Sequence, residues 1–507
     1  MTLNRISLPM MGLVAATLMA PFASAQRGGP DWTTSAGDPQ RTSWVRSDPQ
    51  VTPAKIVKPD AFKFLWKVAM DTTAGKAAEP ILISTYIGYR GFKALTVVGG
   101  PDSIYTVDYD LGVPFWSKHY GTASKAQACA SWSSAIGKLS SLTPIPPRTP
   151  RPSVGYHTVT GKPHEGIPLA AAMGGQLGAG PGQRVAAPAQ QLPPGIRFSV
   201  PIFLVTSDGM ARAITFDSGK EAFKPVPFLP PGSAPSNLIV VQDTLYAATM
   251  PGCGSSPNTI YALDVKTKDM APEGTWKSQG GNILGAPAFN RAGTLFVSTD
   301  SALFALKPKV LESTKVADVQ LASTPIIVTG KNAEWVAVGT KSGSIVLLDA
   351  TGGASTPISI AAGFTPTALA TFDDEKGAHW LVATDSTKSI GAVHAFKMTE
   401  DGGKPTLTEA WKSADMASPG RPIVVGGVVF ALATGADRSH ANGKPPTKGT
   451  HATVYALDAT TGKTLWDSGN TMTSFVSTGE MAFNESELFV PTFDNTLYTF
   501  GHPEPHQ

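Results

Sequence analysis

Cysteine, charge and long apolar runs are all scarce in this chain of 507 residues. The two cysteines, Cys129 and Cys253, lie far apart, and there is no C-x-x-C-H sequence, so neither a disulfide-rich scaffold nor a fused c-type haem is indicated. Charged residues make up 16% of the chain and its net charge is +3, with acids and bases mixed, which argues against a nucleic-acid partner. No stretch after the first 25 residues is long and apolar enough for a membrane span.

The first 25 residues have the pattern of a secretory signal peptide. Arg5 precedes an apolar run at 8–20, and the small residues 23–25 form an A-S-A cleavage pattern before Gln26. Pro9 and Gly12 interrupt the run, which is also too short for a membrane anchor. We therefore expect cleavage after Ala25 and a secreted or periplasmic mature protein.

Glycine and proline are abundant, with 51 and 43 residues, which is typical of many turns between short strands. The stretch at 452–468, ATVYALDATTGKTLWDS, shows the pattern most clearly. Residues 454–458 predict a strand buried on both faces, 460–463 a tight turn, and 464–466 a second strand whose Trp466 requires a large apolar partner. A single hairpin is marginal in water, so this unit needs neighbours.

The first strand of this unit recurs along the whole chain. Its copies are mostly 40 to 60 residues apart, a period that indicates a propeller or an array, with a longer gap between the first two. We find eight copies, at 104–108, 213–217, 260–264, 303–307, 345–349, 393–397, 454–458 and 497–501. A β-sandwich also contains many short strands, but it does not explain a repeated strand, turn and tryptophan. The sequence therefore predicts an all-β protein, an eight-bladed β-propeller of four-stranded antiparallel blades.

The last repeat lacks its fourth, Trp-bearing strand. Residues 62–68, FKFLWKV, resemble such a strand and follow no hairpin, so we predict that 62–68 joins the last blade and closes the ring. The expected organisation is a signal peptide at 1–25, an N-terminal extension at 26–61, one propeller domain at 62–501 and a C-terminal tail at 502–507. Truncation before Phe62 should accordingly be tolerated better than truncation through Val68, because only the second cut opens the ring.

The unit TVYALDATTGKTLW at 453–466 and the opening DWTTSAGDPQRTSW at 31–44 resemble the pyrroloquinoline quinone (PQQ) repeat proteins. These are quinoprotein alcohol dehydrogenase-like β-propellers, and the resemblance, to a secreted bacterial member, covers nearly all of 31–501. It implies the fold more strongly than the chemistry, because one fold serves many functions. The family contains enzymes, assembly factors of the bacterial outer-membrane machinery and secreted proteins of other roles.

The enzymes of this family imply features that this sequence does not supply. They commonly have adjacent cysteines that cover the cofactor, and a Glu, Asn and Asp set that holds Ca²⁺ beside the quinone. The two cysteines here are not adjacent, and we match no positions to the Ca²⁺ set. We therefore assign no catalytic, cofactor-binding or metal residue, and keep PQQ with Ca²⁺ as the alternative.

Two long insertions are expected on one face of the propeller, which we call the decorated face. Connections alternate between faces, so the loops between second and third strands share a face with the links between blades. The insertion at 122–195, rich in Pro and Gly, carries Cys129, and the loop at 250–258 carries Cys253. An oxidising compartment favours a disulfide between Cys129 and Cys253, with two separate thiols as the alternative.

The second insertion, at 434–451, contains three possible metal ligands, Asp437, His440 and His451, but their spacing matches no metal motif, and a solvated loop is the simpler interpretation. The acidic stretch at 373–375 predicts an exposed hairpin tip on the opposite face, with Ca²⁺ binding as the alternative. His394 occupies the position of Tyr455 in the repeat, which indicates a packed strand residue.

These patterns favour a noncatalytic binding or scaffold module whose partner is a protein, a glycan or a small molecule at the decorated face. The alternative is a PQQ-dependent oxidoreductase of alcohols or sugars that uses a separate electron acceptor. A funnel on the propeller axis with clustered acids and an Arg or Lys would favour the enzyme, whereas a plugged funnel would favour the binder.

Overall fold

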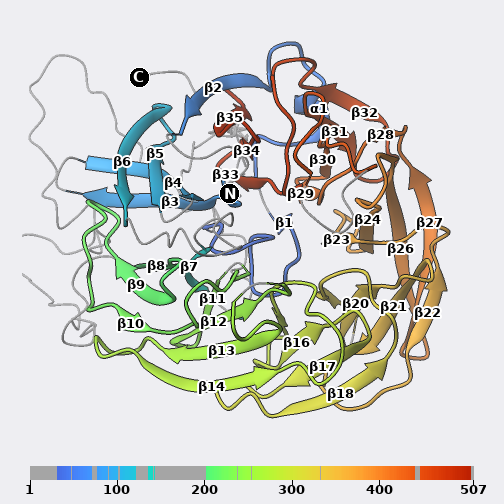
Figure 1. Ribbon diagram of the computed structural model, residues 1–507. Coiled ribbons are helices and arrows are strands. Elements are labelled where there is room, and N and C mark those ends of the chain that lie inside the picture. Colours follow the sequence, from blue (N-terminus) through green and yellow to red (C-terminus); the bar gives the residue numbers. More distant parts are fainter. Residues whose placement is uncertain are drawn as a thin grey trace, which may run out of the picture. The chain divides into compact units, whose positions relative to one another are not determined.

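The computed structural model describes residues 31–503 except for 47, 71–76, 89–90, 101–102, 121–134, 141, 143–200, 237, 253, 332 and 440–445. All of the described residues belong to one compact unit, residues 28–147 and 179–507. This unit is an eight-bladed β-propeller, as the sequence predicts, and Figure 1 shows its blades arranged as a ring. In the described part of the chain, α1 (Pro53–Ile56) is the one α-helix, and no helix there is long and apolar enough to cross a membrane.

The first four blades are built from consecutive strands that pair antiparallel with their neighbours. Blade one contains β3 (Ile81–Gly88), β4 (Gly91–Gly100), β5 (Ser103–Asp108) and β6 (Val113–His119), and blade two β7 (Ala135–Ser140), β8 (Ile202–Val205), β9 (Met210–Ile214) and β10 (Val226–Pro227). Blade three contains β11 (Ile239–Val241), β12 (Thr244–Thr249), β13 (Thr259–Asp264) and β14 (Ala271–Lys277), and blade four β15 (Ala288–Phe289), β16 (Leu295–Ser298), β17 (Ala302–Leu306) and β18 (Ser313–Asp318).

The other four blades follow the same order, except that the last takes its outer strand from the N-terminal region. Blade five contains β19 (Ile326–Thr329), β20 (Glu334–Gly339), β21 (Ser344–Asp349) and β22 (Ile358–Ala361), and blade six β23 (Ala368–Asp373), β24 (His379–Thr384), β26 (Val393–Asp401) and β27 (Lys404–Lys412). Blade seven contains β29 (Ile423–Val425), β30 (Val428–Ala433), β31 (Thr453–Asp458) and β32 (Thr464–Asp467), and blade eight β33 (Ala482–Asn484), β34 (Glu487–Pro491), β35 (Thr496–Gly501) and β2 (Lys63–Ala69).

Three short strands lie outside this scheme. The strand β1 (Trp44–Val45) pairs parallel with β29, the first strand of blade seven. The strands β25 (Ile390–Gly391) and β28 (Met416–Ala417) pair with each other between blades six and seven. In addition, β7 pairs parallel with β11, which joins blades two and three at their first strands.

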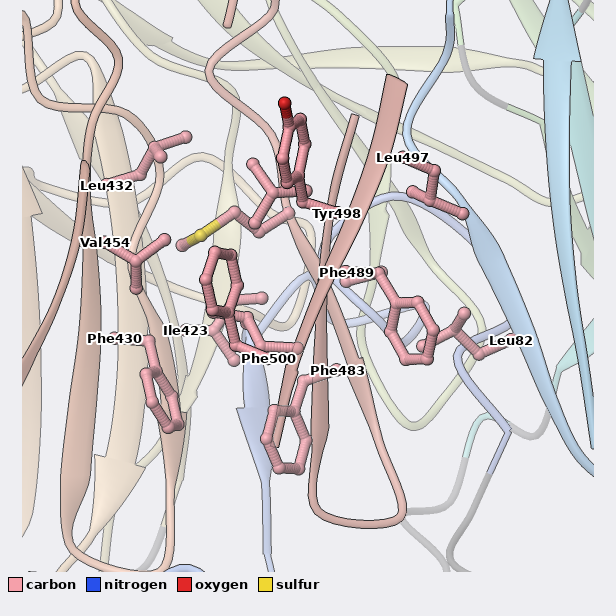
Figure 2. Packing of buried hydrophobic residues seen from close by; sticks show 14 of the residues in the cluster. Leu82, Ile423, Phe430, Leu432, Val454, Phe483, Phe489, Leu497, Tyr498 and Phe500 are labelled. Carbon is pink, nitrogen blue, oxygen red and sulfur yellow. The ribbon is translucent and has the colours of Figure 1, made fainter. Parts of the chain in front are cut away.

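The predicted closure of the ring is confirmed. The strand β2 pairs antiparallel with β35 from Lys63–Gly501 to Ala69–Thr496, so both ends of the chain share blade eight. Blades seven and eight pack closely against each other: Figure 2 shows Phe430 and Val454 of blade seven facing Phe483 and Phe500 of blade eight. Because each blade buries its faces on its neighbours, this seam removes the bare edges of an open ring.

Two boundaries differ from the sequence prediction. Seven of the eight repeat copies coincide with third strands, but in blade two this strand is β9, a few residues before 213–217. The strand β7 also lies inside the stretch 122–195, which we expect to be an insertion. That stretch therefore supplies the first strand of blade two, a short strand that the repeat pattern does not reveal.

The repeated turn and tryptophan lock consecutive blades together. Trp411, in β27 of blade six, donates a hydrogen bond from Nε1 to the carbonyl of Ala459 in blade seven, at 3.0 Å. A Cβ atom on Gly462 of the same turn would lie only 2.5 Å from its indole. The same arrangement recurs elsewhere in the ring, as Trp66 with Tyr109 O and Gly112, and Trp116 with Phe216 O and Gly219. Glycine is therefore required at these positions for two reasons: the turn needs a positive φ, and the tryptophan of the preceding blade leaves no room for a Cβ atom.

This contact predicts the cost of filling it. Gly462→Ala places a Cβ against Trp411 at a φ of 72°, so we expect a loss of about 2–4 kcal/mol, part from backbone strain and part from overpacking. Gly377→Ala is a matched control, because its φ is 76° and no atom lies within 4 Å of the new Cβ. Denaturant unfolding of both variants separates the two terms, and equal losses would contradict the packing argument.

Candidate functional site

Residues 31–46, which we call the axial segment, cross the centre of the ring; Figure 1 shows β1 there. The first strand of each blade presents one unpaired backbone edge to the axis of the ring. The N–H groups along that edge are buried and therefore need hydrogen-bond acceptors. The axial segment bonds to the first strand of seven blades or to the residue just before it: Trp32 to Leu82, Thr33 to Ser140, Thr34 to Leu238, Pro39 to Phe289, Gln40 to Ile327, Thr42 to Thr371 and Ser43 to Val424. The stretch that we expect to be an extension is thus integrated into the ring.

Local chemistry holds the axial segment in its irregular path. The Asp38 carboxylate accepts hydrogen bonds from the backbone N–H and the hydroxyl of Thr42, which closes a tight turn. Just beyond the segment, Asp48 accepts hydrogen bonds from the N–H and hydroxyl of Ser486, which attaches this stretch to blade eight. Burial raises the pKa of Asp38, the expected direction for a carboxyl removed from water.

Arg41 is the most deeply buried cation of the axial segment, with 2% of its surface exposed. Its Nε donates to the carbonyl of Pro287 at 2.8 Å and its Nη1 to that of Ser35 at 2.9 Å, whereas its Nη2 has no hydrogen-bond partner among the residues that the structure describes. Burial, together with repulsion from Arg421, lowers the pKa of Arg41 to about 10, so the guanidinium keeps its charge at neutral pH.

Two carboxyl groups share the field of Arg41, the buried Glu79 and the part-buried Glu480. Glu79 accepts hydrogen bonds from Nε1 of Trp32 at 3.1 Å and from the N–H of Ala36 at 2.9 Å. Burial, followed by repulsion from Glu480, raises the pKa of Glu79 to about 8. Glu480 instead forms an ion pair with Nε of Arg421, at 3.1 Å. At neutral pH this cluster therefore contains more positive than negative charge.

A pocket of about 220 Å³, which we call the axial pocket, lies beside this cluster. It is formed by the links and loops of blades four to eight on the decorated face. Its polar lining consists of Thr324, Thr367, Ser386, Arg421, Arg438, Thr478 and Glu480. Arg421 is fixed by Glu480 and by weaker contacts with the carbonyl of Leu369 and the hydroxyl of Thr324. The pocket is therefore a preorganised polar site with two guanidinium groups and hydroxyl donors.

Arg438 reaches the pocket from the insertion at 434–451. Its Nε donates to the hydroxyl of Ser418 at 2.7 Å, and no carboxylate in the described part of the chain pairs with it. Burial lowers the pKa of Arg438, but a guanidinium remains charged at neutral pH. Within the lining, Glu480 balances the charge of Arg421, but no acidic residue balances the charge of Arg438.

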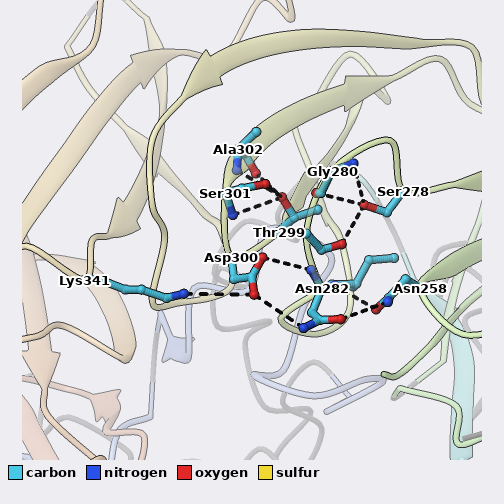
Figure 3. A network of polar contacts seen from close by, with 11 residues as sticks. Asn258, Ser278, Gly280, Asn282, Thr299, Asp300, Ser301, Ala302 and Lys341 are labelled. Atoms are coloured by element: carbon cyan, nitrogen blue, oxygen red, sulfur yellow. Dashed lines mark hydrogen bonds and ion pairs between the residues drawn. The ribbon is translucent and has the colours of Figure 1, made fainter. Parts of the chain in front are cut away.

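Elsewhere on the decorated face the loops bind one another. Figure 3 shows Asn258, Asn282 and Asp300 joining the loops of blades three and four, with Lys341 of blade five 4.0 Å from Asp300. The Asp300 carboxylate accepts a hydrogen bond from the N–H of Asn282 at 2.9 Å. These contacts stiffen the platform around the pocket.

The residues that the sequence singles out are absent from the lining of the pocket or fall outside the described residues. Cys129, Cys253 and His440 fall outside, so their disulfide and ligand roles stay predictions. His451 is exposed, and Asp437 binds Ser439. Among the residues that the structure describes, no group of three or more His, Cys, Asp or Glu is placed to hold a metal ion.

The acidic tip and the histidine have local partners. At 373–375, Asp374 accepts hydrogen bonds from Nε1 of Trp380 and from the N–H groups of Lys376 and Ala378, as in a closed hairpin turn. His394 stacks on Phe364 at 4.0 Å between ring centroids and contacts Glu409 through Nδ1.

The charged residues of the site are not recognised from sequence. Arg41 stands within the opening motif, but nothing in the repeat pattern marks Glu79, Arg421 or Glu480 as partners. Glu79, Arg421 and Glu480 each lie just before the first strand of a blade. The signal that they share is therefore a charged residue at this position. Only the ring brings these positions together, since Arg41 and Glu79 are more than 300 residues from Arg421 and Glu480 in sequence.

No protein-family model and no curated protein matches the sequence. Among solved structures, the quinohemoprotein alcohol dehydrogenase of Comamonas testosteroni has a TM-score of 0.54 at 13% identity, covering 96% of this chain and 83% of its own. The quinohemoprotein alcohol dehydrogenase ADHIIG of Pseudomonas putida HK5 has a TM-score of 0.55 at 11% identity, covering 94% and 82%. Sqt1 of Saccharomyces cerevisiae has a TM-score of 0.51 at 10% identity, covering 88% and 100%. The chain therefore has the β-propeller fold that quinohemoprotein alcohol dehydrogenases also have.

Proposed function

We propose that this protein is a noncatalytic binding or scaffold propeller whose ligand or partner binds at the decorated face, centred on the axial pocket. A signal peptide at 1–25, cleaved after Ala25, would place it in the periplasm or outside the cell. The observation that carries the proposal is the axial segment, because the chain's own backbone occupies the centre of the ring and bonds to the first strands around it. The axis is therefore part of a rigid platform.

The alternative is a PQQ-dependent oxidoreductase, since enzymes of that kind share the fold. The axial pocket contains two Arg and one Glu, of which Arg421 and Glu480 are already paired with each other. The described residues gather no carboxylate set of the kind that Ca²⁺ prefers. The described residues thus do not fit a Ca²⁺–PQQ pair, and we assign the chain no step through it.

The test is a titration of the metal-stripped mature protein with PQQ and Ca²⁺, followed by dye-linked oxidation of simple alcohols and sugars. We expect neither stoichiometric binding at micromolar PQQ nor dye reduction. A known quinoprotein alcohol dehydrogenase, stripped and reloaded in parallel, controls for the reconstitution. Stoichiometric binding with dye reduction would overturn the proposal in favour of the enzyme.

A further inference from the structure

The size and charge of the axial pocket restrict what it can bind. Its volume of about 220 Å³ is below the roughly 300–1,000 Å³ of sites for drug-sized ligands. The part of a ligand that enters the pocket is therefore small. The lining is mostly hydroxyl and charged groups, so the ligand needs several hydrogen-bonding atoms.

The balance of charge points to a single negative group. In the lining, Glu480 compensates Arg421, whereas Arg438 has no acidic partner among the described residues. Arg41, which does not line the pocket but interacts with Arg421, adds positive field, and the pKa of Glu79, about 8, leaves that carboxyl mostly protonated at neutral pH. An unpaired, part-buried guanidinium is costly, and a bound anion removes that cost.

Resting on the proposed function, we infer that the axial pocket binds a small hydroxylated monocarboxylate. Its carboxylate pairs with the free guanidinium edge of Arg438, since an Arg fork matches a carboxylate. Its hydroxyls meet Thr324, Ser386 and Thr478, and the Glu480 carboxylate accepts one of them. A doubly charged phosphate is disfavoured because Glu480 offsets Arg421, so that the lining offers the unbalanced charge of Arg438 alone.

Calorimetric titration of the full mature protein at constant ionic strength tests this inference, with gluconate as probe. Glucose serves as the matched neutral compound, and phosphate and sulfate as inorganic oxyanions. We expect saturable 1:1 binding of gluconate at millimolar affinity or tighter, no binding of glucose, and weaker binding of phosphate and sulfate. Absence of saturable gluconate binding, or binding of glucose equal to it, would overturn the inference.

Single substitutions test whether gluconate binds in the axial pocket. Arg438→Gln should weaken gluconate at least about tenfold, because a charge-assisted hydrogen bond is lost, and Arg438→Lys should restore part of it. Arg291→Gln, which removes a half-exposed guanidinium outside the lining, should leave the affinity unchanged. Equal losses in Arg438→Gln and Arg291→Gln would overturn the assignment to this pocket.

The two proposals fail separately. Loss of gluconate binding without PQQ-dependent dye reduction removes the ligand class and leaves the noncatalytic propeller. Dye reduction with PQQ and Ca²⁺ removes the noncatalytic function, whatever gluconate does.

Discussion

A chain that begins at Ala61 is expected to lose most or all of its folding stability, although it retains the closing strand β2. Residues 31–60 bury Trp32, Val45, Val51 and Ile56 almost completely. At about 1.5–3 kcal/mol for each fully buried apolar side chain, their removal costs roughly 6–12 kcal/mol. That is close to the whole stability of a typical domain, about 5–15 kcal/mol.

The lost hydrogen bonds add to this cost. The N–H groups of Phe289, Ile327, Thr371 and Val424 each lose an acceptor in the axial segment. The sequence predicts only that truncation before Phe62 is tolerated better than truncation through Val68, whereas these contacts predict a large loss for the first cut as well. Thermal and urea unfolding, followed by circular dichroism, would compare chains that begin at Asp31 and at Ala61.

The chain that begins at Asp31 is the control and should unfold like the mature protein. A peptide of residues 31–60, added in trans to the shorter chain, should restore part of the stability if the segment acts through its contacts. Equal unfolding midpoints for the two chains would show that the axial segment contributes little.

The second large effect is a dependence of stability on pH that arises from one carboxyl group. The pKa of Glu79 is about 8 in the folded protein and near its ordinary value of 4.5 when unfolded. Between these values the folded state holds a proton that the unfolded state has released, so the free energy of unfolding falls as pH rises from about 4.5 to about 8. The contribution is complete below this window and lost above it.

Glu79→Gln should remove this slope. The Gln amide oxygen can still accept hydrogen bonds from Trp32 and Ala36, and the variant introduces no charge beside Glu480, Arg421 and Arg41. We therefore expect near-equal stability at about pH 5 and a variant more stable by a few kcal/mol at about pH 8.

Urea unfolding across this range at fixed ionic strength measures the difference. Glu375→Gln, at the exposed hairpin tip of blade six, controls for the loss of one negative charge. Parallel pH profiles for the wild type and Glu79→Gln would mean that Glu79 is ionised in the folded protein.

The repeat was predictable because its signals are local. A buried strand, a glycine turn and a tryptophan occur together at 453–466, and the missing outer strand of blade eight is visible as a gap in that pattern. The axial segment and the pocket were not predictable, because they depend on contacts between polar residues far apart in sequence. Thr42 and Thr371, for example, carry no periodic pattern, yet the ring places them in hydrogen-bond contact.

The same limit applies to charge. Arg421 and Glu480 look like ordinary surface residues in sequence, since each stands among turn residues. Their burial follows from convergence of the blade entrances on one axis, which gives Glu79 and Arg41 their shifted pKa values. Such convergence is a property of the closed ring and of no single repeat.

The axial segment also determines the order in which the protein matures. It is synthesised before any blade, yet its final contacts require all of them, and Asp48 must find Ser486 across 438 residues. Contacts at such separation make folding slow, because a long loop must close before they form. We therefore expect the axial segment, although it is synthesised before the blades, to be among the last parts to reach its final place. Until the ring closes, unpaired strand edges would stay exposed, a state that is prone to aggregation.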